Sequence, residues 1–202
     1  MLDVGANAGQ FARYVTALLP QARVFCFEPL PGPFEQLRNW ADSHGMNGSR
    51  VIAINAALGD SEGEVEIFHH VEHTPSSSLL RSTSLTGGLY PQTRKQRTEI
   101  VSLRTLDKMV EDSSIQLVPD ILIKMDVQGY EDRVLRGGAK VFASARACLL
   151  EINLDLLYEK QASFNELVSL LDGYGLSYRG NFHQTYGRDG HVIFVDAVFS
   201  RE

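Results

Sequence analysis

The 202-residue sequence predicts a single α/β domain with a mostly parallel sheet, an antiparallel last strand and an added β-hairpin. Apolar runs alternate with segments of helical spacing, which is typical of parallel strands joined by crossover helices. Between residues 63 and 103 this alternation gives way to a period of two. The last two strands are joined through Gly187 and Gly190, and such a hairpin-like connection requires them to run antiparallel.

The first third of the chain predicts three strands and two helices. Strands are expected at residues 1–4, 23–27 and 51–56. Helices are expected at 10–19, with Phe11, Tyr14, Val15 and Leu18 on the inner face, and at 33–44, ended by Gly45. Only two residues precede Asp3, so either the first strand is unusually short or a natural N-terminal segment is absent.

The middle of the chain predicts an antiparallel pair, formed by residues 63–71 and 99–103. The stretch between them, residues 74–97, is rich in Ser, Thr, Gly and charge. A connection of that length in a compact domain is usually a functional loop or a disordered one. We expect it to be a substrate lid.

The remainder predicts a regular continuation of the alternation. Helices are expected at 105–112, from 130 to a stop at Gly137–Gly138, and at 163–171, where Ser163 and Glu166 form a capping box. Strands are expected at 121–125, 147–152, 176–179 and 192–199.

Composition and charge exclude several classes of protein. The net charge of −6 argues against a nucleic-acid partner, and the basic run of Arg94, Lys95 and Arg97 is expected to be a solvated loop. No apolar run is long enough to span a membrane and no signal sequence is evident. Cys26 and Cys148 lie in apolar runs and are expected to be buried, reduced thiols of a cytoplasmic protein.

Four motifs carry the chemistry. The first, Asp3-Val-Gly5-Ala-Asn7-Ala-Gly9, is a glycine turn before a helix. The second is Phe27-Glu28-Pro29, in which Glu28 lies at the tip of the next strand. This pairing is typical of a nucleoside site, in which the acid binds ribose hydroxyls. The spacing departs from the nicotinamide pattern Gly-x-Gly-x-x-Gly, which disfavours a dehydrogenase.

The third motif is Asn55-Ala56-Ala57-Leu58-Gly59, whose small residues suit a flat slot for adenine. The fourth runs from Lys124 to Glu131. Lys124 and Asp126 are two apart on a strand, so they project to the same face at the carboxyl end of the sheet, where such sheets bind ligands.

The four motifs in this order resemble the FkbM-type S-adenosylmethionine-dependent methyltransferases, from Asp3 to about Asn153. The resemblance implies a Rossmann-like class I methyltransferase fold, S-adenosylmethionine as cofactor, and O-methylation of a hydroxyl on a saccharide or secondary metabolite. One departure is Gln128, which stands where the family usually has Glu.

The expected site follows from the motifs and this resemblance. Cofactor contacts are expected from Asp3, Gly5, Ala6, Asn7, Gly9, Phe11, Glu28, Pro29, Asn55, Ala56, Ala57, Asp126 and Val127. An alcohol must lose its proton during methylation, so a nearby base helps. Asp126 is the first candidate and Glu151 the second, with Lys124 orienting a carboxylate or the substrate. Asp126 can equally be a contact to the positive sulfonium.

Other residues are expected to stay outside the chemistry. His69, His70 and His73 are expected at a solvated hairpin end, with no metal site. His183 and His191 lie in the last hairpin, and Tyr158 and Tyr186 are expected to have no role. Two other functions remain open: a protein that binds the cofactor but has little or no activity, motivated by Gln128, and, remotely, an NAD-dependent oxidoreductase.

Overall fold

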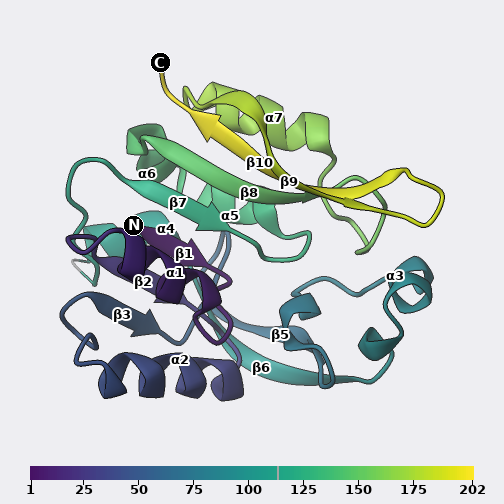
Figure 1. Cartoon of the computed structure of the whole chain (residues 1–202), viewed down its shortest axis with the longest axis horizontal. Helices are drawn as coiled ribbons and strands as arrows, with labels where there is room; N and C mark the ends of the chain where they lie inside the picture. Colours follow the sequence, from purple (N-terminus) through teal and green to yellow (C-terminus); the bar gives the residue numbers. More distant parts are fainter. Residues whose placement is uncertain (113) are drawn as a thin grey trace.

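The computed structural model describes residues 1–112 and 114–202, and its core is a twisted sheet with the strand order β3-β2-β1-β7-β8-β10-β9 (Figure 1). The strands are β1 (Leu2–Val4), β2 (Val24–Phe27), β3 (Val51–Ile54), β7 (Leu122–Met125), β8 (Ala147–Asn153), β9 (Ser177–Tyr186) and β10 (Val192–Ser200). The first five strands in this order pair in parallel, and β10 runs antiparallel to both β8 and β9. The predicted fold class is confirmed.

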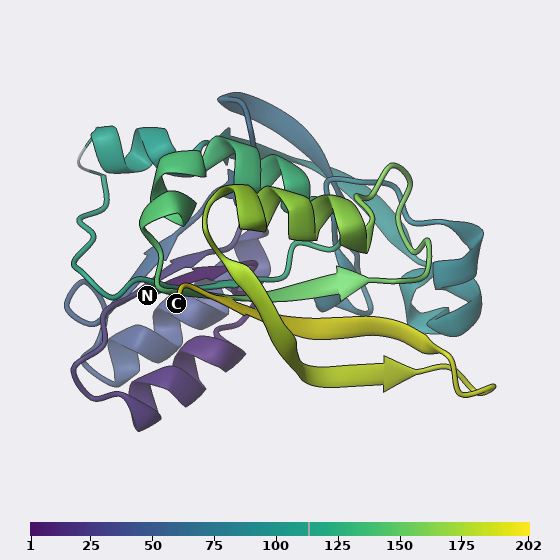
Figure 2. The ribbon, with the colours of Figure 1, turned by 90° about the horizontal axis from the view of Figure 1, so that it is seen from above.

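Helices cover both faces of this sheet (Figures 1 and 2). On one face lie α1 (Gln10–Leu18) and α2 (Pro31–Ser43). On the other lie α4 (Leu106–Glu111), α5 (Glu131–Gly137), α6 (Ala139–Ser144) and α7 (Phe164–Gly173). The predicted capping box is present at α7, where Ser163 and Glu166 exchange side-chain-to-backbone hydrogen bonds.

Strand β2 shows how two buried faces produce a continuous apolar sequence. Val24 and Cys26 pack with α1 and α2, whereas Phe25 and Phe27 join the larger core under α4–α7. Successive side chains of a strand point to opposite faces, so a strand covered on both sides can be apolar at every position, as β2 is.

Three predicted details of the elements were wrong. The inner face of α1 is formed by Ala12, Val15 and Thr16, whereas Tyr14 and Leu18 are 61% and 59% exposed. The small inner side chains let α1 lie close to the sheet. Helix α6 was not predicted, because Gly137 and Gly138 suggested only a helix end. Strand β9 continues to Tyr186, well past the predicted end at 179.

A second, three-stranded sheet contains β4 (Ala57–Leu58), β5 (Gly63–His70) and β6 (Gln96–Arg104) in the order β4-β6-β5. Strands β5 and β6 are antiparallel, as predicted for residues 63–71 and 99–103. They form a sheet of their own with β4, not an extension of the core sheet.

The stretch 74–97 between β5 and β6 is ordered by short helices: η1 (Thr74–Ser76), α3 (Ser84–Leu89) and η2 (Pro91–Thr93). It runs along the carboxyl end of the core sheet and contacts the connection between β8 and α7 (Figure 1). The amide of Thr83 donates to the carbonyl of Leu157 at 2.8 Å, and the amide of Glu159 donates to the carbonyl of Arg81 at 2.8 Å.

Two further predictions concern surface and core. Arg94, Lys95 and Arg97 are exposed, as expected. Cys26 and Cys148 are buried free thiols. Within the described ranges, no helix combines the length and apolar character that a membrane span requires.

Candidate active site

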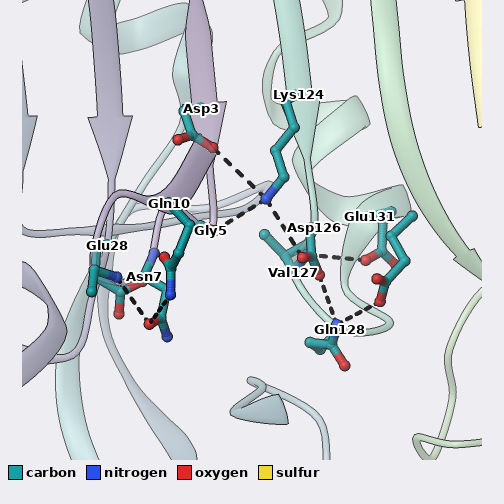
Figure 3. Close-up of polar contacts among 12 residues, drawn as sticks. Asp3, Gly5, Asn7, Gln10, Glu28, Lys124, Asp126, Val127, Gln128 and Glu131 are labelled. Carbon is teal, nitrogen blue, oxygen red and sulfur yellow. Dashed lines mark hydrogen bonds and ion pairs between the residues drawn. The ribbon is translucent and has the colours of Figure 1, made fainter. Parts of the chain in front are cut away.

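The glycine turn after β1 brings three chain segments into contact (Figure 3). Gly5 has φ 75°, and a Cβ at this position would lie 1.9 Å from the carbonyl oxygen of Asp126. Only glycine permits both this backbone conformation and this approach. Asn7 also adopts the left-handed region, with φ 46°, and its backbone N–H donates to Glu28 Oε2 at 2.8 Å.

Glu28, at the end of β2, is held by backbone donors. Its two carboxylate oxygens accept hydrogen bonds from the amides of Asn7 (2.8 Å) and Leu30 (2.9 Å). Burial raises the pKa of Glu28 to about 7, although both hydrogen bonds act in the opposite direction. Each carboxylate oxygen can accept a second hydrogen bond, so Glu28 can still bind ribose hydroxyls.

Lys124 lies between two carboxylates (Figure 3). Its Nζ is 3.5 Å from Asp126 Oδ2, 3.7 Å from Asp3 Oδ1, and donates to the carbonyl of Gly5 at 3.2 Å. Burial alone would lower the pKa of Lys124, but the attraction of Asp126, Asp3 and Glu151 outweighs it and the pKa is raised. The predicted shared face of Lys124 and Asp126 is confirmed by this contact.

Gln128 joins two acidic side chains. Its Nε2 donates to Asp126 Oδ1 and to Glu151 Oε1, both at 2.6 Å, and its Oε1 accepts from the hydroxyl of Tyr158 at 2.6 Å. Burial and then the charge of Asp126 raise the pKa of Glu151 well above its usual value. An ionised glutamate at this position would have no N–H to donate, whereas the amide of Gln128 donates to both carboxyl groups.

Beside the glycine turn is a cavity of about 630 Å³, here called the first cavity. Eight of the residues expected to contact the cofactor line it: Gly5, Asn7, Glu28, Pro29, Ala56, Ala57, Asp126 and Val127. Sequence reasoning missed the opposite wall, which comes from the stretch after β5 and consists of Thr74, Pro75, Ser77, Ser78 and Leu79.

The other expected cofactor residues lie outside this wall. Asp3 is fully buried behind Lys124, and Ala6 and Phe11 pack in the core beneath α1 and α2. Gly9 is the N-cap of α1. The side-chain amide of Asn55 donates to the carbonyls of Glu28 and Pro29, both at 2.9 Å, so it fixes the backbone beside the cavity.

A second cavity, of about 550 Å³, adjoins the first and shares Asp126 and Pro75 with it. Its walls are formed by His73, Pro75, Ser76, Thr86, Tyr90, Asp126, Gln128, Glu151, Asn153, Leu157, Tyr158 and Phe194. Asp126 and Glu151, the two candidate bases, therefore meet here. Most of the other residues were missed, because they come from connections whose folding no local pattern reveals.

The run Ser76-Ser77-Ser78 divides the two cavities. Ser78 Oγ donates to the carbonyl of Gln128 at 2.7 Å, and Ser77 Oγ accepts from the amide of His70 at 3.1 Å. The carbonyl of Ser76 lies 2.9 Å from the hydroxyl of Tyr158. Ser77 and Ser78 face the first cavity and Ser76 faces the second.

The expectation that the three histidines lie at a solvated hairpin end was wrong for two of them. Tyr158, expected to have no role, is 1% exposed and belongs to the wall of the second cavity. His69 and His70 are buried, not solvated, because His69 contacts Glu99 and His70 contacts the carbonyl of Thr93 on neighbouring segments. Across residues 1–112 and 114–202, no three His, Cys, Asp or Glu side chains are grouped as a metal site would require.

The site thus consists of a cavity beside a glycine turn and a second, polar cavity, with Asp126 in the walls of both. Comparisons with known proteins identify the family. Residues 3–179 match the family described as the methyltransferase FkbM domain. The chain belongs to the FkbM methyltransferase family. S-adenosylmethionine is accordingly the cofactor of this domain, and the remote NAD-dependent alternative falls away.

Curated relatives of this FkbM domain include enzymes of different organisms. It is 28% identical to the 2-O-methyltransferase NoeI of Sinorhizobium fredii, over 87% of this chain and 72% of that one. It is also 28% identical to the 31-O-demethyl-FK506 methyltransferase FkbM of Streptomyces tacrolimicus, over 88% and 72%. The hexuronic acid methyltransferase AglP of Haloferax volcanii is 28% identical over 75% of this chain and 54% of that one.

Solved structures share the fold. An FkbM methyltransferase from Methylobacillus flagellatus aligns with a TM-score of 0.61 and 13% identity, covering 99% of this chain and 42% of that chain. Magnesium protoporphyrin IX methyltransferase from Synechocystis, solved with bound S-adenosylmethionine, aligns with a TM-score of 0.53 and 12% identity, covering 100% and 69%. The chain thus spans less than half of the first of these structures.

Proposed function

We propose that this FkbM domain transfers the methyl group of S-adenosylmethionine to a hydroxyl of a saccharide or secondary metabolite. The observation that carries the proposal is the junction of the two cavities at Asp126. Methyl transfer requires a donor and an acceptor to be held in line, and two adjoining cavities offer one compartment for each.

The residues of the first cavity fit this cofactor. Glu28 is placed to accept hydrogen bonds from two ribose hydroxyls, and Ala56 and Ala57 leave room for a flat base. Asp126, whose Oδ2 lies 3.5 Å from Lys124 Nζ, places a carboxylate towards the positive sulfonium. When bound, the cofactor supplies a methyl group that is already activated.

In the second cavity, Glu151 is the base that we assign to the acceptor hydroxyl. The O–H proton would pass to Glu151 as the oxygen bonds to the methyl carbon, and the cofactor's carbon–sulfur bond would break to leave S-adenosylhomocysteine. A carboxylate of raised pKa is a stronger proton acceptor than an ordinary one. Gln128 fixes this carboxylate beside Asp126.

NoeI is named as a 2-O-methyltransferase and FkbM as a 31-O-demethyl-FK506 methyltransferase. Both names support oxygen as the methylated atom. The buried free thiols Cys26 and Cys148 support a reducing compartment, and we propose the cytoplasm.

Isothermal titration calorimetry with S-adenosylmethionine tests the cofactor assignment. We expect saturable binding, weakened roughly tenfold in Glu28→Gln, because the neutral amide accepts hydrogen bonds less strongly than a carboxylate. Glu35→Gln, on the exposed side of α2, is the matched control and should bind as the wild type does. Absence of binding at millimolar cofactor would rule out the proposed function.

A further inference from the structure

Most polar groups in the second cavity already have partners within the protein. Thr86 Oγ1 donates to the carbonyl of Leu157, His73 Nδ1 lies 2.9 Å from Ser76 Oγ, and Gln128 is bonded through both ends of its amide. These side chains build the wall, and little of their hydrogen-bonding capacity remains for a ligand.

Two side chains in the same wall are exceptions. Tyr90 Oη and Asn153 Oδ1 are buried and have no hydrogen-bond partner among the described residues. Buried polar atoms in native proteins are nearly always bonded, so each exception needs a partner. A hydroxyl and an amide from two residues that line one cavity can each donate and accept, which suits a ligand that carries several hydroxyls.

The charge of the cavity narrows the ligand class. Asp126 and Glu151 lie in the wall, and the pKa of the Tyr90 hydroxyl is raised by burial and then by Glu151 and Asp155. None of the described residues that line the cavity is a lysine or an arginine. An acceptor bearing a carboxylate would find two carboxyl groups and neither a lysine nor an arginine among the described residues of this wall, and an uncompensated charge of this kind selects against the wrong partner.

The cavity also has an apolar side. Pro75, Leu157 and Phe194 contribute to its wall beside the polar groups. Binding sites of this kind combine an apolar surface with a few placed polar groups that fix orientation. A pyranose ring has both properties, because its C–H faces are apolar and its hydroxyl edge is polar.

We propose that Tyr90 and Asn153 are the acceptor-recognising residues of this site and that the acceptor is a neutral saccharide ring rather than a uronic acid. This rests on the proposed function, because the second cavity is taken as the acceptor compartment. It also separates this domain from its relative AglP, whose name identifies hexuronic acid as its substrate.

The test uses the full chain saturated with S-adenosylhomocysteine, whose binding is first verified by calorimetry. The probes are the methyl glycosides of glucose, mannose, galactose and fucose, together with methyl glucuronide, which has a carboxylate in place of the hydroxymethyl group of methyl glucoside. Saturation-transfer NMR titration gives their affinities. We expect at least one neutral glycoside to bind and methyl glucuronide to bind about tenfold more weakly than methyl glucoside or not at all.

Three variants assign the effect to residues. Tyr90→Phe and Asn153→Leu should each lower the affinity for the neutral glycoside about tenfold, since each removes hydrogen bonds to the ligand. The affinity for S-adenosylhomocysteine should stay unchanged in both variants. Glu151→Gln should reduce the difference in affinity between methyl glucoside and methyl glucuronide. Tyr186→Phe, an exposed tyrosine outside the cavity, is the control and should bind as the wild type does.

The outcomes separate the two proposals. If S-adenosylhomocysteine does not bind, the proposed function fails. If it binds but no neutral glycoside does, or methyl glucuronide binds as tightly as the neutral probes, the saccharide assignment is overturned. If glycoside affinity is the same in Tyr90→Phe and Asn153→Leu as in Tyr186→Phe, the two residues do not recognise the acceptor.

Discussion

Asp126 lines both cavities, and we propose that it acts on the cofactor side of the reaction. Lys124 Nζ lies 3.5 Å from one carboxylate oxygen, and the Gln128 amide donates to the other. A carboxylate at this junction would attract the positive sulfonium of the donor and would gain nothing from the neutral product.

We therefore predict that Asp126→Asn weakens S-adenosylmethionine roughly tenfold and leaves S-adenosylhomocysteine within about twofold, because only the former carries the positive charge. Calorimetry with the two ligands measures the ratio. Asp60→Asn, at an exposed position, should leave the ratio unchanged. An equal loss for both ligands would show that Asp126 acts through structure alone.

Gly5 is the second position where a single residue decides the site. We predict that Gly5→Ala lowers the free energy of unfolding by roughly 2–4 kcal/mol, since the methyl group would overlap the carbonyl of Asp126 and the φ of 75° strains any other residue. Urea denaturation measures the change. Gly32→Ala, where a Cβ meets nothing within 4 Å, is the matched control and should change stability little.

At the scale of the element, the stretch 74–97 has two parts with different contacts. Thr74, Ser77, Ser78 and Leu79 line the first cavity, Pro75 lines both cavities, and Ser76, Thr86 and Tyr90 line the second. The proposal that this stretch is a substrate lid therefore applies to its second part. Deleting the whole stretch would damage the cofactor cavity as well.

Thr86 is one of the anchors of that second part. We predict that Thr86→Val, which removes its buried hydrogen bond to Leu157, weakens this docking by roughly 1 kcal/mol. Hydrogen–deuterium exchange should then become faster in residues 82–90 while β1 and β7 stay protected. The control Ser84→Ala, at a neighbouring exposed position, should exchange like the wild type. If residues 82–90 exchange equally fast in both variants, the hydrogen bond of Thr86 is not an anchor.

At the scale of the whole molecule, buried acids make stability depend on pH. Burial raises the pKa of Glu131 to about 7, although the amides of Val127 and Gly129 donate to its carboxylate. The unfolded value is close to 4.5. Between these two values the folded state binds more protons than the unfolded state, so the contribution of Glu131 to stability decreases as pH rises from 4.5 to 7.

Between pH 5 and pH 7.5 the free energy of unfolding of the wild type should decrease, in part because of Glu131. We predict that this decrease is roughly 2 kcal/mol smaller in Glu131→Gln, whose amide oxygen can still accept both N–H groups. Urea unfolding at the two pH values measures this difference. Glu64→Gln, exposed on β5, should follow the wild type. A wild-type slope in Glu131→Gln would contradict the assignment.

The sequence by itself determined the order of the core elements and one side of the site. Strand and helix periods, glycine turns and the acid after β2 depend on neighbours in the chain, so Gly5, Asn7, Glu28 and Asp126 could be named in advance. The left-handed conformation of Asn7 follows from the same local turn chemistry.

Only the tertiary structure decided the opposite wall and the second cavity. Ser76, Ser78 and Tyr90 come from the connection between β5 and β6, and Tyr158 comes from the connection between β8 and α7. They line the second cavity or contact Gln128, and the hydrogen bond between Tyr158 and Ser76 spans 82 residues of sequence. Local pattern indicates where elements and turns begin and end, but it carries no information about which distant loop covers the end of the sheet. The glycine turn is therefore readable from the sequence, whereas the second cavity exists only once the chain has folded.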